Sequence, residues 1–205
     1  YVVMVTADHG NLEQLWNGDG SAHVAHTSNP VEFILLDPSA ECAPHLQDGK
    51  LADIAPTVLA AMGLKQPAAM QGDSLAPDHA WGGQRHVLLI ILDGWGIGLA
   101  DNSNPIYLGP APVWENLIRN YPCCRLQASG EAVGLQAGKP GNSEAGHMNI
   151  GAGRVVLQDD VRLDQAMDDG SFYTNDVFLS TIDEVKARAG SLHLLLNAAL
   201  DISFR

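Results

Sequence analysis

Two apolar segments of this 205-residue chain are each followed by residues that commonly bind metal ions. Tyr1–Thr6 precedes Asp8 and His9, and Val87–Leu92 precedes Asp93. A carboxylate oxygen beside an imidazole nitrogen suits Mn²⁺ or Zn²⁺ better than Ca²⁺. Taken alone, Asp8 and His9 are explained at least as well by a solvated loop that caps a helix.

Ser143 has the surroundings of an activated hydroxyl group. Gly141 and Gly146 let the backbone come close to a ligand, and Glu144 and His147 follow at helical spacing. If a helix begins at Ser143, its free N–H groups and its dipole would favour a phosphate and lower the cost of a seryl alkoxide. On spacing alone, an ordinary helix-capping serine explains the pattern equally well.

The apolar segments predict the elements that position these residues. A short, β-branched, apolar segment bounded by Gly is typical of a buried parallel strand, and parallel sheets bind ligands at the carboxyl ends of their strands. We therefore expect Tyr1–Thr6 and Val87–Leu92 to direct their carboxylates to one sheet edge. Val31–Leu36 predicts a further strand. Strand and helix signals alternate, which indicates an α/β fold.

Other segments complete this α/β pattern. Apolar periodicity predicts helices at Leu51–Met62, Asn116–Tyr121 and Asp176–Ala189, with Gly63 as the C-cap of the first. The short apolar segment Ser191–Leu196 predicts a closing strand. Residues from about Pro67 to His86 have no periodicity, so we expect a loop and a junction there.

Composition narrows the function classes. A net charge of −13, with only 11 scattered Lys and Arg residues, argues against nucleic acid or an anionic membrane surface as a partner. Cys42 and the adjacent Cys123 and Cys124 have no metal-finger spacing, so we expect a reduced, cytoplasmic setting. No segment approaches the roughly 18 apolar residues of a membrane helix. Because Tyr1 already lies inside a strand pattern, we expect the chain to be a piece of something longer.

Several motifs are longer than a metal site alone would require: Leu92–Gly96, Leu126–Leu135 and Gly141–Val156 in the second half, and Thr6–Asn11, Ala25–Pro30 and Leu51–Val58 in the first. The second-half motifs resemble the amino-terminal part of cofactor-independent (2,3-bisphosphoglycerate-independent) phosphoglycerate mutase. The first-half motifs resemble the carboxyl-terminal part of the same family. The resemblance covers nearly everything except the junction and the last ten residues.

The resemblance implies an alkaline-phosphatase-like α/β metalloenzyme with a mostly parallel sheet flanked by helices. Its members carry two Mn²⁺ ions and convert 3-phosphoglycerate to 2-phosphoglycerate through a phosphoserine. By resemblance, Ser143 is the nucleophile, Asp93, Ser143, Asp8 and His9 hold one metal, and His26 belongs to the second. Zn²⁺ or Mg²⁺ is less expected, and the imidazole ligands disfavour Mg²⁺.

Two departures from the family pattern limit what we expect. The order is inverted: residues 1–76 resemble the carboxyl-terminal segment and residues 87–205 the amino-terminal one, with a junction at 77–86, so we expect one circularly permuted α/β domain. Nothing corresponds to the inserted substrate-binding domain or to the Asp-Met-Val-Gly-His segment of the second metal site. Asp19 with His23 is the only Asp-x-x-x-His pair and a weak substitute. One complete metal site is expected.

Three functions follow from this pattern. The first is phosphoglycerate mutase chemistry acting through Ser143 on a phosphoglycerate-type substrate, impaired because groups that hold the substrate are absent. The second is a residual metal-dependent phosphatase, in which water attacks the phosphoserine. The third is an inactive metal-binding fragment whose exposed strand edges pair with a complementary chain or with a second copy.

Overall fold

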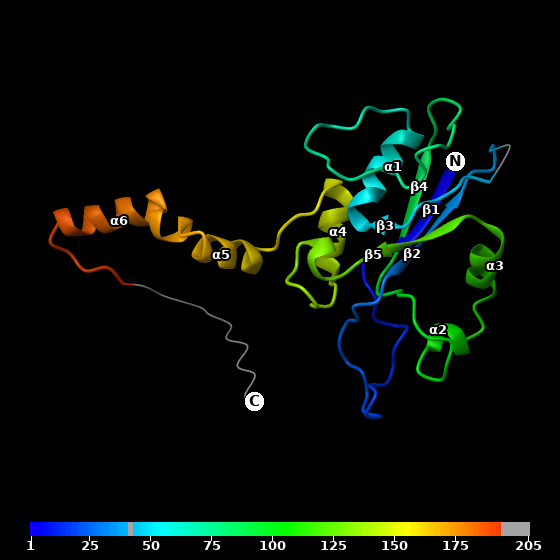
Figure 1. Cartoon of the computed structure of the whole chain (residues 1–205), viewed down its shortest axis with the longest axis horizontal. Coiled ribbons are helices and arrows are strands. Elements are labelled where there is room, and N and C mark those ends of the chain that lie inside the picture. Colours follow the sequence, from blue (N-terminus) through cyan, green and yellow to red (C-terminus); the bar gives the residue numbers. More distant parts are fainter. Residues whose placement is uncertain (41–42, 194–205) are drawn as a thin grey trace. The chain divides into compact units, whose positions relative to one another are not determined.

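The structure is a computed structural model that describes residues 1–40 and 43–193. It contains a five-stranded sheet in the order β3-β5-β2-β1-β4 (Figure 1). The strands are β1 (Val2–Ala7), β2 (Val31–Leu36), β3 (Gly49–Lys50), β4 (Val87–Leu92) and β5 (Cys123–Gln127). Four strands run in one direction and β2 runs against them. The predicted α/β fold with a mostly parallel sheet is confirmed.

The two strands that precede the candidate metal ligands are neighbours. β1 and β4 pair in parallel along their whole length, ending with Ala7 opposite Leu92. Asp8 follows Ala7 and Asp93 follows Leu92, so the register brings both carboxylates to the same edge of the sheet. The prediction that both strands direct their carboxylates to one sheet edge is therefore confirmed.

β2 has the predicted bounds but runs antiparallel to both of its neighbours, β1 and β5. Residues 8–30, which connect β1 to β2, contain no helix. A parallel neighbour requires a crossover connection that is usually helical, whereas a chain that simply turns back pairs antiparallel. The long loop between the two strands, which carries His9 and His26, therefore returns to the sheet beside β1.

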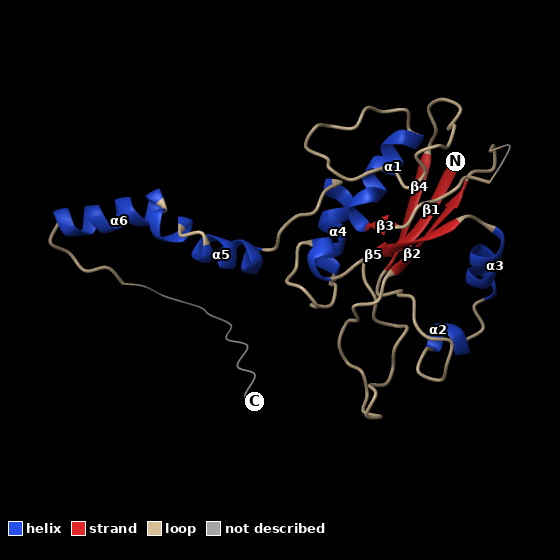
Figure 2. Ribbon diagram, in the orientation of Figure 1, coloured by secondary structure: helices blue, strands red, loops and turns tan. Residues whose placement is uncertain are grey.

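Helices lie on both sides of the sheet (Figure 2). α1 (Ile54–Ala61) and α4 (Ser143–Ala152) share a hydrophobic core with the face of β2 that carries Phe33. Glu32 points to the opposite face, where it lines a cavity together with residues of α2 (Pro105–Leu108) and α3 (Pro112–Asn120). α4 therefore belongs to the well-packed side of the sheet.

The helix predictions are largely confirmed. A 3₁₀ turn (Leu51–Asp53) and α1 fill the predicted Leu51–Met62 segment, and Gly63 follows with a left-handed φ of +68°. α3 includes nearly all of the predicted Asn116–Tyr121 helix, and α6 (Asp176–Ala187) ends two residues early. Residues 191–193 form no strand, and the rest of the predicted closing strand lies outside the described residues, as does Cys42.

Asp37, the residue after β2, holds the end of the loop that joins α1 to β4. Its buried carboxylate accepts a hydrogen bond from Arg85 Nη2 at 3.0 Å and lies 3.2 Å from His79 Nε2. Burial raises the pKa of Asp37, but hydrogen bonds from Ser39 and His79 and the charge of Arg85 outweigh burial and hold this pKa at about 2. The predicted loop at residues 67–86 has no helix or strand, and this cluster ties it to the sheet.

The chain divides into two compact units, residues 1–161 and 162–205. All described strands lie in the first unit, which also holds the 3₁₀ turn Gly130–Val133. The second unit contains most of α5 (Asp159–Asp168), the 3₁₀ turn Ser171–Thr174 and α6. Strands from residues 1–76 and from residues 87–205 share one sheet. That these two parts correspond to the carboxyl-terminal and amino-terminal segments of the family, joined at 77–86, stays a prediction. Among the described residues we find no helix with the length and apolar character of a membrane span.

Candidate metal centre

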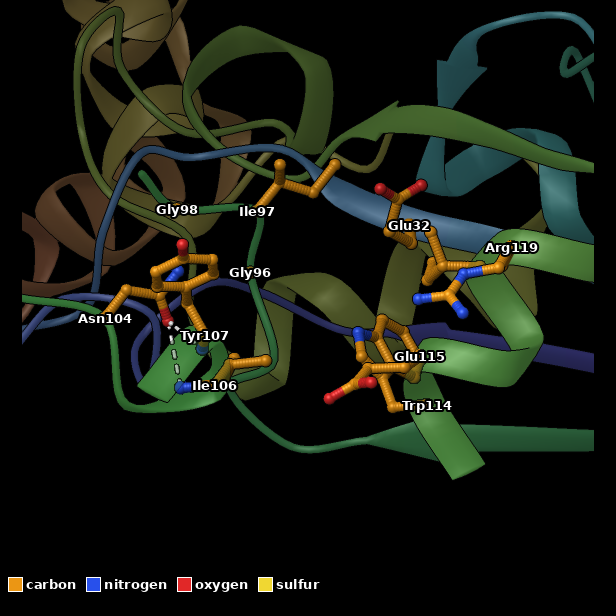
Figure 3. Close-up of a pocket in the computed structure, with 11 residues that line it drawn as sticks. Glu32, Gly96, Ile97, Gly98, Asn104, Ile106, Tyr107, Trp114, Glu115 and Arg119 are labelled. Atoms are coloured by element: carbon orange, nitrogen blue, oxygen red, sulfur yellow. Dashed lines mark hydrogen bonds between the residues drawn. The ribbon is translucent and has the colours of Figure 1, made fainter. Parts of the chain in front are cut away.

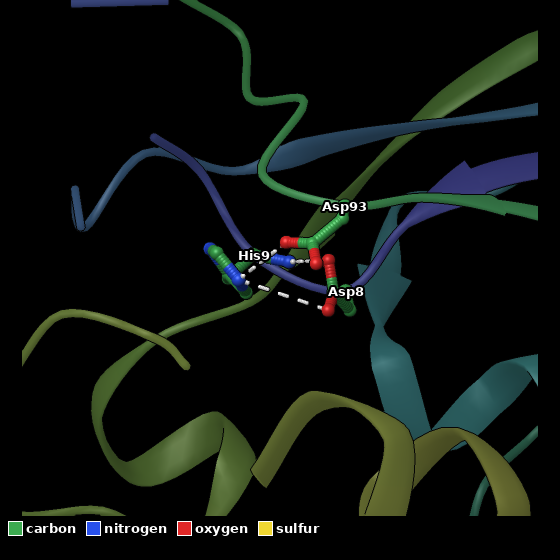
Figure 4. A group of neighbouring side chains, drawn as sticks. All are labelled: Asp8, His9 and Asp93. Carbon is green, nitrogen blue, oxygen red and sulfur yellow. Dashed lines mark hydrogen bonds and ion pairs between the residues drawn. The ribbon is translucent and has the colours of Figure 1, made fainter. Parts of the chain in front are cut away.

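Asp8, His9 and Asp93 meet at the carboxyl ends of β1 and β4 (Figure 4). Each offers one ligand atom, and these atoms all lie within 4.8 Å of one another. Within residues 1–40 and 43–193 this is the one group of three or more Asp, Glu, His or Cys side chains that comes so close. Asp8 and His9 are buried, whereas the Asp93 side chain is 80% exposed. The site is thus open to solvent on the Asp93 side.

Asp8 is held from both ends of its carboxylate. Oδ1 accepts hydrogen bonds from the backbone N–H groups of His9 at 3.1 Å and Gly94 at 3.2 Å. Oδ2 accepts a hydrogen bond from Ser143 Oγ at 2.6 Å. Because the Gly94 amide follows Asp93 directly, the same bonds fix Asp8 relative to the end of β4. The carboxylate is therefore pre-oriented toward the serine hydroxyl.

His9 directs one ring nitrogen toward both carboxylates. Its Nδ1 lies 3.1 Å from the Gly10 carbonyl oxygen, which can only accept, so Nδ1 carries the proton of that bond. Nε2 then faces Asp93 Oδ1 at 3.2 Å and Asp8 Oδ2 at 3.7 Å. A nitrogen lone pair that faces two carboxylate oxygens is a suitable set of ligand atoms for a metal ion. Orientation of a ligating histidine by a backbone carbonyl is the usual arrangement in metal sites.

A helix does begin at Ser143, which is the first residue of α4. The helix is capped by Asn142, whose side chain accepts a hydrogen bond from the Ala145 N–H, so Ser143 does not serve as the cap. Gly146 faces the Asp8 backbone so closely that an added Cβ would collide with the Asp8 carbonyl oxygen. The absence of a side chain at this position lets Ser143 reach Asp8.

His26 lies beside this group but is not part of it. Its ring stacks on that of His9, with centroids 4.1 Å apart, and its Nδ1 lies 2.9 Å from the Gly141 carbonyl oxygen. The carbonyl can only accept, so His26 Nε2 is left as the nitrogen able to bind a ligand. The structure therefore gathers Asp8, His9, Asp93 and Ser143 and leaves His26 adjacent to them.

The Asp19 and His23 pair does not form a second metal group in the described part of the chain. The exposed Asp19 carboxylate accepts hydrogen bonds from the backbone and hydroxyl of Ser21. These bonds lower the pKa of Asp19. His23 Nδ1 lies 2.8 Å from Asn17 Oδ1. The Asp19 carboxylate and the Nδ1 atom of His23 therefore make contacts within their own loop.

His147 is at the site although it was outside the predicted ligand set. Its Nδ1 lies 3.3 Å from Asp8 Oδ2, 3.4 Å from Ser143 Oγ and 2.9 Å from the Ser143 carbonyl oxygen. The signal was present in the sequence, because residues four apart on a helix share a face. Its side chain is half-exposed, so it lines the open side of the centre.

A cavity of about 460 Å³ lies on the α2 and α3 side of the sheet (Figure 3). Glu32 of β2 and Trp114, Glu115 and Arg119 of α3 are among the side chains that line it. Burial raises the pKa of Glu32 although the charge of Arg125 opposes the rise. None of the predicted site residues lines this cavity, so it is separate from the metal centre.

The donor set fits a divalent cation. Two carboxylates, one imidazole and a serine hydroxyl converge, and no thiolate belongs to the group in the described residues. Oxygen ligands with one imidazole suit Mn²⁺ and Zn²⁺, whereas Mg²⁺ is usually bound by carboxylates, water and phosphates. The arrangement can therefore hold a metal beside a nucleophilic hydroxyl group.

Comparison with known proteins agrees with this chemistry. A family model described as the metalloenzyme superfamily matches residues 1–66 and 85–196. The 2,3-bisphosphoglycerate-independent phosphoglycerate mutase 1 of Methanosarcina barkeri is 48% identical over 117 residues, which are 57% of this chain and 23% of the relative. The 2,3-bisphosphoglycerate-independent phosphoglycerate mutase of Moorella thermoacetica is 47% identical over 111 residues, which are 54% and 22%. The chain thus spans about a quarter of the length of these relatives. No solved structure matches it.

Proposed function

Because the chain belongs to the metalloenzyme superfamily, we propose that it performs metal-dependent phosphoryl transfer of the phosphoglycerate mutase type, with Ser143 as the nucleophile. One observation carries this proposal: Ser143 Oγ donates a hydrogen bond to Asp8 Oδ2 at 2.6 Å, across 135 residues of sequence, beside the Asp8, His9 and Asp93 group. A serine that only caps a helix bonds to a backbone N–H group of that helix and not to a distant carboxylate. The names of the relatives supply the substrate class, phosphoglycerate.

In the proposed reaction, Ser143 Oγ attacks the phosphorus atom of 3-phosphoglycerate and the bond from phosphorus to the substrate oxygen breaks. The phosphoryl group then moves from Ser143 to the other hydroxyl group, which gives 2-phosphoglycerate. Asp8 Oδ2 holds the hydroxyl and can accept its proton, which then passes to the substrate oxygen that leaves; in the second transfer the proton of the attacking hydroxyl returns to Ser143 Oγ. The free N–H groups and dipole at the start of α4 favour the phosphate. A divalent cation, when bound, would lower the serine pKa and neutralise charge on the phosphoryl oxygens.

We propose Mn²⁺ as the metal, held by Asp8, His9, Asp93 and Ser143, with Zn²⁺ or Mg²⁺ less suited. His26 supplies one ligand toward a second ion, and none of the described Asp, Glu, His or Cys side chains forms a second group around it. The expected stoichiometry is therefore one tightly bound Mn²⁺. Calorimetric titration of the chain with Mn²⁺ measures it, and two equal tight sites would contradict the proposal.

We expect this chain to be a poor mutase, because transfer between two hydroxyl groups requires a substrate that is held and reoriented. The test is conversion of 3-phosphoglycerate to 2-phosphoglycerate with Mn²⁺, together with mass spectrometry of the phosphoserine. Ser143→Ala should abolish the phosphopeptide, whereas Ser180→Ala, an exposed serine of α6, should not. Rapid turnover by the chain would refute the expected impairment. A phosphopeptide that survives Ser143→Ala would refute the nucleophile.

A phosphatase is the second candidate, supported by the 80% exposure of the Asp93 side chain. Water can reach a phosphoryl group on Ser143 from this open side, and hydrolysis then competes with return to the substrate. The expected result is slow, Mn²⁺-dependent release of inorganic phosphate that disappears in Ser143→Ala. Conversion to 2-phosphoglycerate without phosphate release would favour the mutase instead.

A further inference from the structure

Glu13 is a buried carboxylate in the loop after β1, with 1% of its surface exposed. Four groups donate hydrogen bonds to it. Oε2 accepts from the backbone N–H groups of Asn11 at 2.8 Å and Gly96 at 3.0 Å, while Oε1 accepts from Asn29 Nδ2 at 2.9 Å and from the Thr27 hydroxyl. Burying a carboxylate is costly unless its oxygens are fully bonded, and here each oxygen has two donors.

The four donors come from the three segments that carry the candidate ligands. Asn11 follows Asp8 and His9, Thr27 and Asn29 follow His26, and Gly96 follows Asp93. Backbone hydrogen bonds join the same segments, from the Thr27 N–H to the Gly10 carbonyl at 3.0 Å and from the Leu12 N–H to the Gly94 carbonyl at 2.8 Å. Glu13 therefore connects the three segments that carry the candidate ligands.

The chain leaves space for this carboxylate. A Cβ added to Gly96 would lie 2.5 Å from both Glu13 carboxylate oxygens, and one added to Gly10 would lie 2.5 Å from Oε1. Real Cβ atoms do not come this close, so both loops would have to move. The two glycines let the ligand-bearing loops close around Glu13.

We propose that Glu13 is a positioning residue that sets the spacing of Asp8–His9, Asp93 and His26 and thereby tunes metal affinity. This inference rests on the proposed metal-dependent function. Glu13 does not contact the ligands themselves. It acts through the backbone of the loops that carry them, so its loss should alter the geometry of a bound ion before it unfolds the chain.

The first test is Glu13→Gln with Mn²⁺ alone as the probe. The side chain keeps its size, but an NH₂ group replaces one acceptor oxygen and then faces two donors. We expect Mn²⁺ affinity to fall about tenfold or more, the range found for outer partners of metal ligands. The electron paramagnetic resonance spectrum of bound Mn²⁺ should also change, while far-UV circular dichroism stays the same. Glu115→Gln, on exposed α3, is the matched control and should change none of these.

Thr27 offers a second test that keeps Glu13 itself. Thr27→Val removes the hydroxyl donor at constant shape, whereas Thr27→Ser retains it. We expect weaker Mn²⁺ binding and an altered spectrum in Thr27→Val and near-normal values in Thr27→Ser. If Glu13→Gln does not fold, this pair decides the inference.

Wild-type affinity and spectrum in a folded Glu13→Gln, or equal affinities in the two Thr27 variants, would overturn the positioning role. Failure of the proposed function has a different signature: Mn²⁺ binding depends on Glu13 as expected, but no phosphoserine forms at Ser143. A wild-type chain that does not bind Mn²⁺ would overturn both.

Discussion

The close approach of α4 to Asp8 predicts a large effect of one methyl group. In Gly146→Ala, the added Cβ would lie 3.0 Å from the carbonyl carbon and from Cβ of Asp8, and nearer still to the carbonyl oxygen. Favourable carbon–carbon contacts are about 3.5–4.0 Å. These atoms belong to Asp8, which directly follows the paired strand β1 and is held by hydrogen bonds from Gly94 and Ser143, so relieving the contact requires α4 to move by about 0.5–1 Å.

That movement changes both the site and the stability. The distance from Ser143 Oγ to Asp8 Oδ2 is 2.6 Å, and an increase of about 1 Å would end the hydrogen bond. Overpacking costs about 1–3 kcal/mol, while alanine recovers up to about 1 kcal/mol as the better helix former. The net loss is therefore at most about 3 kcal/mol, which corresponds to a Tm lower by up to roughly 12 °C for a domain of this size.

Gly151 provides the matched control, because it lies on the exposed side of the same helix and an added Cβ meets nothing within 4 Å. Gly151→Ala should raise the free energy of unfolding by up to about 1 kcal/mol. Scanning calorimetry gives Tm, and titration calorimetry gives Mn²⁺ affinity, which should fall at least tenfold only in Gly146→Ala. Equal Tm values and equal Mn²⁺ affinities for the two variants would refute the reasoning.

Three further predictions concern pH, metal binding and association. The pKa of Asp37 is held at about 2, below its ordinary value of 3.8. The ionised carboxylate therefore stabilises the folded state above about pH 4, and this contribution is lost as the pH falls from about 4 through about 2. Urea unfolding between pH 2 and pH 6 should show a smaller loss in Asp37→Asn than in the wild type, and equal losses would contradict the assignment. Asp93→Asn should weaken Mn²⁺ binding at least tenfold with an unchanged Tm of the metal-free chain, because the side chain is exposed; unchanged calorimetric affinity would remove Asp93 from the site. β4 is an edge strand of the described sheet, and Leu88 on it is 48% exposed. Size-exclusion chromatography should therefore show association that increases with protein concentration. Leu88→Lys should reduce this association, whereas the control Val24→Lys, on an exposed loop, should not. Association that persists in Leu88→Lys would assign it to another surface.

Local sequence predicted the paired strands well. β1 is largely buried, as its continuous apolar sequence predicts, whereas the expected burial of β4 is wrong, because β4 lies at the edge of the described sheet with Leu88 and Ile90 exposed. The direction of β2 could not be predicted, because a period of two residues is the same in parallel and antiparallel strands. β5 was missed altogether. In Cys123–Gln127 only Cys124 and Leu126 face inward, which is too short an alternation to stand out from a loop.

The candidate site was predictable where each residue stands next to a recognisable element. Asp8 and Asp93 follow strands, and Ser143 begins a helix, so the family motifs and the local patterns agree with the observed convergence. Their roles remain predictions. Glu13 had no local signal, since its four hydrogen bonds come from three loops whose closeness depends on the whole sheet.

The inverted order that we infer from the family resemblance, and propose to be a circular permutation, need not disturb this centre. The ligands are positioned by the parallel register of β1 with β4 and by the contact of α4 with Asp8, and neither depends on which strand comes first in the chain. The loop that joins α1 to β4 enters at the other end of β4, where Asp37 and Arg85 hold it. We therefore expect metal binding and the proposed nucleophile to tolerate such a permutation, whereas we expect mutase turnover to depend in addition on groups that hold and reorient the substrate. Metal affinity and phosphoserine formation, measured separately from turnover, distinguish these two requirements.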